Sequence, residues 1–117
     1  MNNTSGAWTM LAQGQISATT AGTDIPVIEN IPAISNLNVY AVTVTNAGSG
    51  IAYYTEPVAR GATANQGTPV PNTTSPGTGV QEFGPRDLKD VIANGNPQMR
   101  SGTGTVNVRY RIFVLSR

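Results

Sequence analysis

The stretch TVNVRYRIFVLS, residues 105–116, decides the fold that the sequence predicts. Its apolar side chains recur at every second position, and polar side chains, including Arg109 and Arg111, fall between them. Because successive side chains of a strand point to opposite faces, one face is apolar and the other is polar until it reaches Phe113 and Leu115. We predict a strand here. Most strands have about 5–6 residues, so this length also suggests a contact outside the domain.

The composition limits the class of protein. The 117 residues suit one domain, and only 11% of them are charged, with Gly, Thr, Asn, Ser and Pro in their place. A net charge of +1 gives no general field for nucleic acid or an anionic membrane. The absence of Cys and His excludes disulfides, thiol metal sites and histidine chemistry. The sequence has no apolar run of membrane-spanning length and no secretory signal at residues 1–5, so we expect no membrane partner.

An apolar island lies within the otherwise polar residues 1–14. It consists of Trp8, Met10 and Leu11. Trp is enriched among the residues that dominate protein interfaces, which favours an extended arm that anchors on a neighbouring molecule. The alternative is that Trp8 packs into the core of its own domain. We take residues 1–14 as an extended N-terminal arm and residues 15–117 as a single β-domain.

The middle of the chain predicts further strands. Short strands are expected at residues 15–20 and 23–28, the second at a sheet edge because it contains Pro26. Residues 37–45 and 51–56 alternate like the two strands of a hairpin around a loop that contains glycine.

Tyr53 and Tyr54 are neighbours in the second of these hairpin strands. Side chains of adjacent strand residues point to opposite faces. We therefore expect one tyrosine in the core and the other facing outward or toward a partner.

Residues 59–80 and 85–94 complete the predicted architecture. The first stretch is rich in Pro and Gly, and loops longer than ~12–15 residues are usually functional or disordered. It is either a mobile surface loop or a loop ordered by a neighbouring molecule. The second predicts a short helix that starts at Pro85, has Asp87 at its positive end and stops at Gly95. With five or six strands, we predict an all-β antiparallel sandwich or small barrel with one short helix, an N-terminal arm and one long loop.

Residues for catalysis do not gather in the sequence. The six carboxylates are dispersed, and only Asp87 and Asp90 are close, on what we interpret as a solvated helix face. Residues 101–104 imitate a phosphate-binding loop but precede a strand rather than a helix. We therefore predict no enzyme activity and no catalytic, cofactor-binding or metal-binding residue.

Arg109 and Arg111 share one face of the predicted final strand. They could contact nucleic-acid phosphates, pair with carboxylates across the sheet, or face a protein partner. The low net charge and the lack of a basic cluster argue against nucleic acid. Arginine forms bidentate contacts and is enriched at protein interfaces, so a protein partner is favoured. The interface candidates are Trp8, Met10, Leu11, Tyr53, Tyr54, Arg109 and Arg111.

The run VYAVTVTNAGSGIAYY, residues 39–54, is followed by the segment DLKDVI and a long final strand. In a small chain without Cys or His and rich in Thr, Asn and Gly, this pattern resembles small virion proteins of tailed bacteriophages. The similarity is to capsid decoration (cement) proteins and to β-sandwich modules of head fibres and tails, and it covers residues 36–117. It contains no catalytic or ligand motif and transfers no site residues.

The resemblance implies a structural protein, made in the host cytoplasm and located in the virion. We expect a homo-oligomer, trimeric or of another symmetry, that binds the major capsid protein or another virion protein on the outside of the shell. Residues 1–14 and 59–80 would carry the lattice contacts. The alternatives are a head–tail, tail or fibre-base component with an adhesive role, a self-assembling coat protein that binds RNA, and a carbohydrate-binding module that stacks Tyr53 or Tyr54 on sugar.

Overall fold

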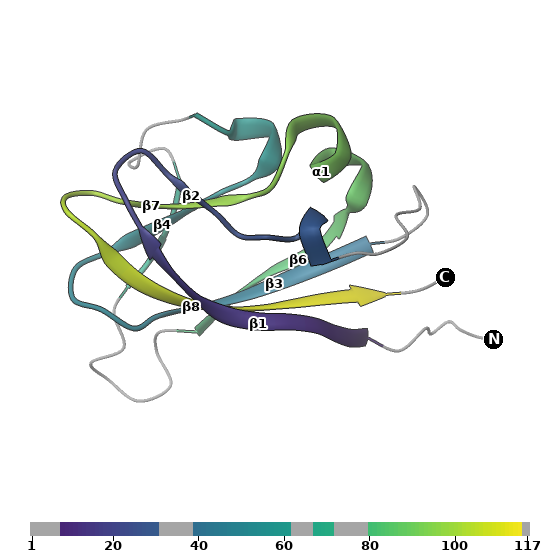
Figure 1. Cartoon of the computed structure of the whole chain (residues 1–117), viewed down its shortest axis with the longest axis horizontal. Coiled ribbons are helices and arrows are strands. Elements are labelled where there is room, and N and C mark those ends of the chain that lie inside the picture. Colours follow the sequence, from purple (N-terminus) through teal and green to yellow (C-terminus); the bar gives the residue numbers. More distant parts are fainter. Residues whose placement is uncertain (1–7, 31–38, 62–66, 72–79, 116–117) are drawn as a thin grey trace.

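The computed structural model describes residues 8–30, 39–61, 67–71 and 80–115. They form two antiparallel four-stranded sheets that pack face to face, with a short helix at one end (Figure 1). The large sheet has the strand order β1-β8-β3-β6, and the small sheet has the order β2-β7-β4-β5. The predicted all-β antiparallel sandwich with one short helix is confirmed.

The large sheet consists of β1 (Trp8–Ala18), β3 (Val39–Asn46), β6 (Val80–Asp87) and β8 (Val106–Leu115). The long final strand is confirmed as β8, which pairs with β1 on one side and β3 on the other. The residues that its alternation assigns to the apolar face are the ones that enter the core: Val106, Val108, Ile112 and Val114 are buried, and Tyr110 is partly buried.

Residues 8–14 differ from the expected free arm. They form the first part of β1, which continues past the expected domain boundary at residue 15 and pairs with β8 along its length. A register shift between Met10 and Ala12 marks a β-bulge at Leu11. Pairing with the long β8 satisfies backbone hydrogen bonds that a free arm would leave to water. Residues 1–7 lie outside the described part of the chain.

The small sheet consists of β2 (Thr23–Asp24), β4 (Ala52–Thr55), β5 (Thr68–Val70) and β7 (Gln98–Ser101). β2 is an edge strand, as predicted for residues 23–28, but it is only two residues long. After β2, the chain turns inward and buries Ile25 and Val27 completely before a 3-10 helix, Ile28–Asn30. Burial of these apolar side chains between the sheets therefore ends the strand early.

The segment expected to be one long loop, residues 59–80, contains a strand. β5 pairs with β4, and Val70 is fully buried in the core. A short 3-10 helix, Pro57–Ala59, leads out of β4 toward this segment. The described residues 67–71 thus belong to the domain itself, because they pair with β4 and place Val70 in the core. Residues 62–66 and 72–79 lie outside the described part of the chain.

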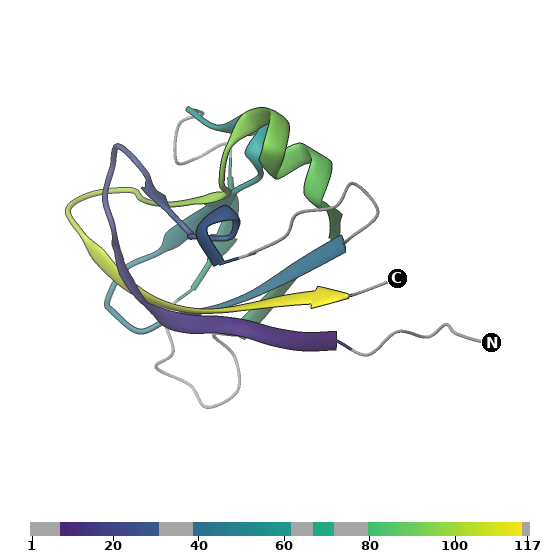
Figure 2. The ribbon, with the colours of Figure 1, turned by 45° about the vertical axis from the view of Figure 1, so that its right-hand side comes forward.

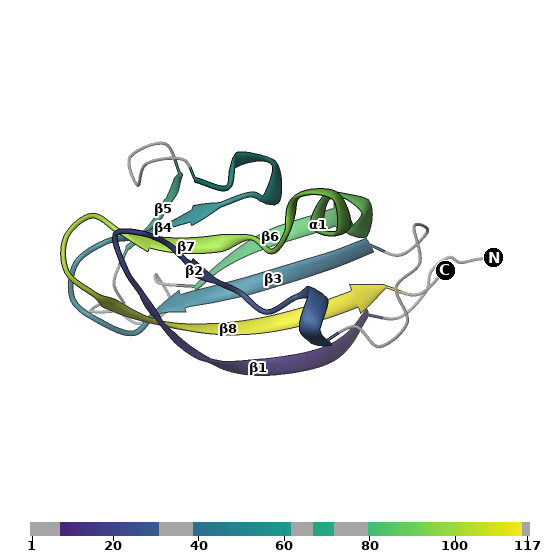
Figure 3. The same cartoon turned by 45° about the horizontal axis from the view of Figure 1, so that its top comes forward.

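The predicted hairpin between residues 37–45 and 51–56 is wrong, because β3 and β4 lie in different sheets (Figure 3). The buried Asn46 holds the connection that crosses between them. Its Nδ2 donates to the carbonyl oxygens of Gly50 (2.9 Å) and Val70 (3.0 Å), and its Oδ1 accepts from the Gly48 N–H (3.0 Å). These bonds tie the end of β3 to β5 in the small sheet.

The helix α1 (Leu88–Asn94) is confirmed but begins later than expected, because residues 85–87 extend β6 alongside β3. Asp87 caps it by accepting a hydrogen bond from the Lys89 N–H (2.9 Å). Gly95, with φ of +97°, ends it as predicted. The apolar helix residues divide between two environments: Leu88 and Val91 are buried, and Ile92 is exposed. The helix lies over the end of the sandwich, as Figure 2 shows from a second side.

Aromatic and ionic contacts join the two sheets near this end. The ring of Tyr54 on β4 stacks on Phe83 of β6, with centroids 3.8 Å apart. Arg86 of β6 donates to the Glu56 carboxylate that follows β4, at 2.8 and 3.0 Å. Tyr40 and Tyr54 are buried, and neither hydroxyl has a well-formed hydrogen bond to another described residue. Burial raises the pKa of both phenols, and the nearby Glu56 carboxylate raises both further.

We expect Asn46→Ala to lower the free energy of unfolding by roughly 2–3 kcal/mol, because the buried Val70 carbonyl and the partly buried bonds to Gly48 and Gly50 lose their partner. Chemical denaturation measures the change. Asn94→Ala, at the exposed end of α1, is the control and should cost less than about 0.5 kcal/mol. Equal losses in the two variants would show that Asn46 does not hold the connection.

The protein should also lose stability in alkali. Because the pKa of Tyr40 and Tyr54 is raised in the folded state, the unfolded chain releases these protons first. The contribution of these two protonated phenols to the free energy of unfolding is therefore complete below about pH 10 and falls as the pH rises beyond it. Denaturation at about pH 8 and about pH 11 tests this, and Tyr40→Phe/Tyr54→Phe should remove most of the loss. A loss of the same size in the double variant would assign it to other groups.

Candidate protein-binding surface

One face of the large sheet is turned away from the core, and we call it the outer face. Residues directly opposite each other in paired strands place their side chains on the same face. The pairing registers therefore assign the following side chains to the outer face: Trp8, Met10, Gln13 and Gln15 of β1; Arg109, Arg111, Phe113 and Leu115 of β8; Val39, Ala41, Thr43 and Thr45 of β3; and Val80 and Glu82 of β6.

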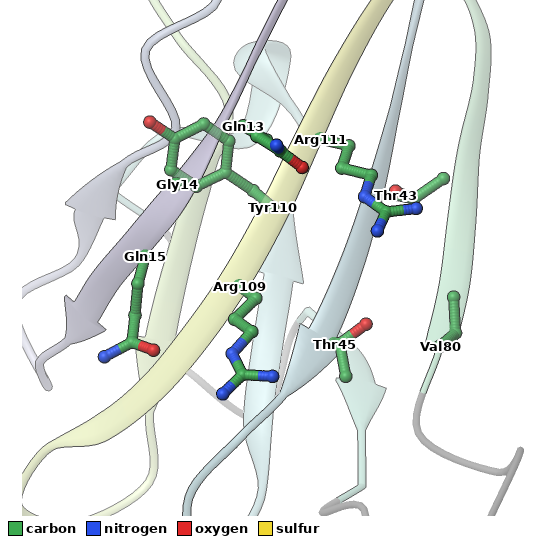
Figure 4. Close-up of a pocket in the computed structure, with 9 residues that line it drawn as sticks. All are labelled: Gln13, Gly14, Gln15, Thr43, Thr45, Val80, Arg109, Tyr110 and Arg111. Carbon is green, nitrogen blue, oxygen red and sulfur yellow. The ribbon is translucent and has the colours of Figure 1, made fainter. Parts of the chain in front are cut away.

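Half of the outer face is polar and cationic. Arg109 and Arg111 stand along β8, and each has a glutamine of β1 on one side and a threonine of β3 on the other (Figure 4). The rows are Gln15–Arg109–Thr45 and Gln13–Arg111–Thr43. They line an open hollow of about 460 Å³. Both arginines are exposed, and neither forms an ion pair with any residue that the structure describes.

The two positive charges are close together. Alternate residues of a strand are roughly 6.5–7 Å apart, so the Arg109 and Arg111 side chains leave β8 close to each other and on the same face. Their neighbours are neutral amides and hydroxyls, which can donate or accept hydrogen bonds but do not neutralise charge. This half of the outer face is therefore suited to carboxylates of a partner, which arginine binds in bidentate fashion.

The other half of the outer face is apolar. Trp8 lies opposite Leu115, and Met10 lies opposite Phe113. Trp8 is 44% exposed and Met10 is 46% exposed, so large apolar surfaces face solvent here. Beside them is a second hollow of about 310 Å³, lined by Trp8, Ala41, Thr43, Glu82, Gly84, Pro85 and Phe113. Gly84 lets β6 approach β3 closely beside this hollow, since a Cβ there would lie 2.5 Å from the Ala41 Cβ.

The structure brings four of the interface candidates onto this one surface: Trp8, Met10, Arg109 and Arg111. Leu11 differs, because at the bulge it packs partly against the core. Tyr54 is 1% exposed and stacked on Phe83, so it has no surface to offer a partner. Tyr53 is half-buried on the small sheet. The expectation that one of the two tyrosines enters the core is confirmed, but neither lies on the outer face.

Sequence analysis missed the other members of the surface, notably Phe113, Gln13 and Gln15. A signal for Phe113 existed, since the polar face of the final strand becomes apolar there. Its position beside Met10 depends on the register of β1 against β8, two strands at opposite ends of the chain. Register follows from burial and pairing in three dimensions, and the sequence of either strand alone does not fix it.

Within residues 8–30, 39–61, 67–71 and 80–115, no three His, Cys, Asp or Glu side chains are grouped to hold a metal ion. No helix in the same residues is long and apolar enough to cross a membrane. Comparison of the chain with protein-family models, curated proteins and solved structures found no match. The candidate site therefore rests on the geometry and composition of the outer face.

Trp8 is the only tryptophan, so its fluorescence reports on the outer face. Because 44% of its surface is open to solvent, we expect a red-shifted emission that acrylamide quenches efficiently in the free protein. Stern–Volmer titration, with the unfolded chain in denaturant as the reference, measures this accessibility. An emission that resists quenching would mean that Trp8 is packed inside the protein and would remove it from the surface.

Proposed function

We propose that the protein is a non-enzymatic structural component of a tailed-phage virion, of the capsid decoration type. It attaches to the major capsid protein on the outside of the shell through the outer face of its large sheet. The observation that carries the proposal is the gathering of exposed Trp8 and Met10 with Phe113 next to Arg109 and Arg111, which form no ion pair with a described residue.

The composition of this surface favours a protein partner. Aromatic residues, Met and Arg are the types that protein interfaces enrich, whereas the solvated face of an antiparallel sheet is normally polar. Complete burial of a large apolar side chain contributes roughly 1.5–3 kcal/mol. Covering the exposed parts of Trp8 and Met10 would therefore contribute on the order of 1 kcal/mol each.

The charge of the surface supports an acidic protein patch rather than nucleic acid as the partner. Nucleic-acid binding draws on many phosphate contacts, and its affinity grows with the number of cations. Among the described residues of the outer face, Arg109 and Arg111 are the only cations, Glu82 is also present, and the whole chain has a net charge of +1. Two arginines with carboxylate partners give orientation and specificity at the rim of an apolar contact.

The virion setting is supported by the resemblance of residues 36–117 to small phage virion proteins. A decoration protein meets the same partner many times on a lattice, so modest contacts are sufficient through avidity. The proposed contact differs in one respect from the expectation for the sequence. Residues 8–14 and 68–70 lie in strands of the domain, so the outer face replaces the arm and the loop as the main attachment surface.

The proposal predicts weaker attachment when the outer face changes. Shells prepared without this protein are titrated with purified wild type and with Met10→Ser, Arg111→Glu and the double variant. We expect the double variant to bind at least about tenfold more weakly, because it loses apolar burial and opposes an acidic partner. Ile92→Ser on α1 is the matched control, since Ile92 is 47% exposed and Met10 is 46% exposed. Equal binding of the double variant and the control would refute attachment through this face.

The number of copies in the particle separates decoration from the alternative functions. Quantitative mass spectrometry of purified virions should find the protein in a high number that follows the shell lattice. A low number confined to the tail would instead identify a tail or fibre-base component. Shell-like assemblies formed by the purified protein alone would identify a coat protein.

A further inference from the structure

The edge strands of the two sheets differ in how they are protected. An edge strand presents unpaired N–H and C=O groups, and proteins usually prevent pairing there with short strands, charged residues, Pro or bulges. In the described chain, β2 has two residues, β5 has three including Pro69, and β6 carries Glu82, Pro85 and Arg86. These three edges are therefore poor templates for another strand.

The fourth edge, β1, lacks most of this protection. It is 11 residues long, contains neither a charged residue nor Pro, and runs along the margin of the molecule (Figures 1 and 3). The bulge at Leu11 interrupts it near one end. At the other end, the Ser17 carbonyl already accepts a hydrogen bond from the Thr23 hydroxyl (2.6 Å). The regular part of this edge is therefore residues 12–16, with its midpoint at Gly14, and no other described strand pairs with it.

A hydrogen bond made by the neighbouring strand β8 shows which backbone groups of β1 point away from the sheet. The Asn107 carbonyl accepts from the Ala47 N–H (2.8 Å), so Asn107 directs its backbone groups toward the β3 side of β8. Ser17, opposite Asn107, must then direct its own groups away from β8, in agreement with its bond to Thr23. By alternation along the strand, Gln13 and Gln15 present free N–H and C=O groups at the edge.

We propose that this edge pairs with the same edge of a second copy of the chain. The two strands would be antiparallel about a two-fold axis at Gly14, joining two large sheets into one continuous eight-stranded sheet. Gln13 of each copy lies opposite Gln15 of the other, and the pair exchanges both backbone hydrogen bonds. Because the edge is symmetric about Gly14 and uncharged, a second copy matches it without repulsion.

Side chains on both faces fit this pairing. On the outer face, the amide side chains of Gln13 and Gln15 meet across the axis and can hydrogen-bond each other. On the inner face, Ala12 lies opposite Ile16 of the second copy. The Tyr110 ring lies over Gly14, where a Cβ would be 2.7 Å from its hydroxyl (Figure 4). Glycine at the axis therefore leaves room for the Tyr110 rings of both copies.

The size of the contact sets the expected strength. Pairing over residues 12–16 gives about four backbone hydrogen bonds, fewer than the roughly 10 of a typical stable interface. We therefore expect a reversible dimer with a dissociation constant in the range of about 10–500 µM, rather than a permanent one. The arginines of the two copies stay about 14 Å apart, three strand spacings, which exceeds the screening length of about 8 Å at physiological salt.

Sedimentation equilibrium of the full chain across this concentration range tests the proposal. Wild type should dimerise reversibly. Gln13→Lys/Gln15→Lys places like charges opposite each other and should be monomeric at every concentration. Gln13→Lys/Gln15→Glu places opposite charges across the axis and should dimerise at least as well as wild type. Thr43→Lys/Thr45→Lys is the control, because it adds two charges beside the same arginines but on β3, which is not an edge strand. It should leave dimerisation unchanged.

Circular dichroism of each variant verifies that it is folded. A monomeric wild type at the highest concentration, a trimer, or dimerisation of Gln13→Lys/Gln15→Lys equal to that of wild type would overturn the proposal. Loss of dimerisation in Gln13→Lys/Gln15→Glu would overturn the register about Gly14. A wild type that stays monomeric but accepts a strand from another virion protein would also overturn the proposal of a dimer. Attachment to shells is tested with variants of Met10 and Arg111, and dimerisation is measured on the free protein, so the two proposals can fail separately.

Discussion

The antiparallel pairing of β8 with β1 on one side and β3 on the other is the interaction on which the rest of the structure depends. It joins the first and last strands of the described chain and supplies much of the inner face of the large sheet. The same alternation that buries Val108 and Ile112 leaves Arg109 and Arg111 outside. One strand therefore supplies both the core and the centre of the candidate binding surface.

Local patterns in the sequence predicted the features that depend on a single element. Alternation defined the two faces of β8, and the Asp87 and Gly95 signals identified α1. Features that depend on distant partners were not predictable in this way. The β3–β4 connection looks like a hairpin, but the amide of Asn46 bonds the carbonyl of Val70, which comes from a segment rich in Gly and Pro. For the same reason, α1 begins later than the sequence predicts, because β3 pairs with β6 as far as Asp87.

The candidate surface shows the same limit. The exposure of Arg109 and Arg111 follows from their own strand, and sequence analysis predicted it. The meeting of Met10 with Phe113 requires the register between strands from opposite ends of the chain. Adjacent Tyr53 and Tyr54 had to point in opposite directions, but only packing against Phe83 decided that Tyr54 is the buried one. The sequence of a strand thus predicts which of its side chains share a face. The pairing of distant strands decides which of these faces lie side by side in one surface.

The pairing of Trp8 with Leu115 has a practical consequence for protein engineering. The first and last described residues lie at the same corner of the large sheet, next to the apolar half of the outer face. An affinity tag or fluorescent fusion joined directly at Trp8 or Leu115 would lie at that corner and would shield it from a binding partner. The exposed turn at residues 102–104, between β7 and β8, is a better insertion point for a label.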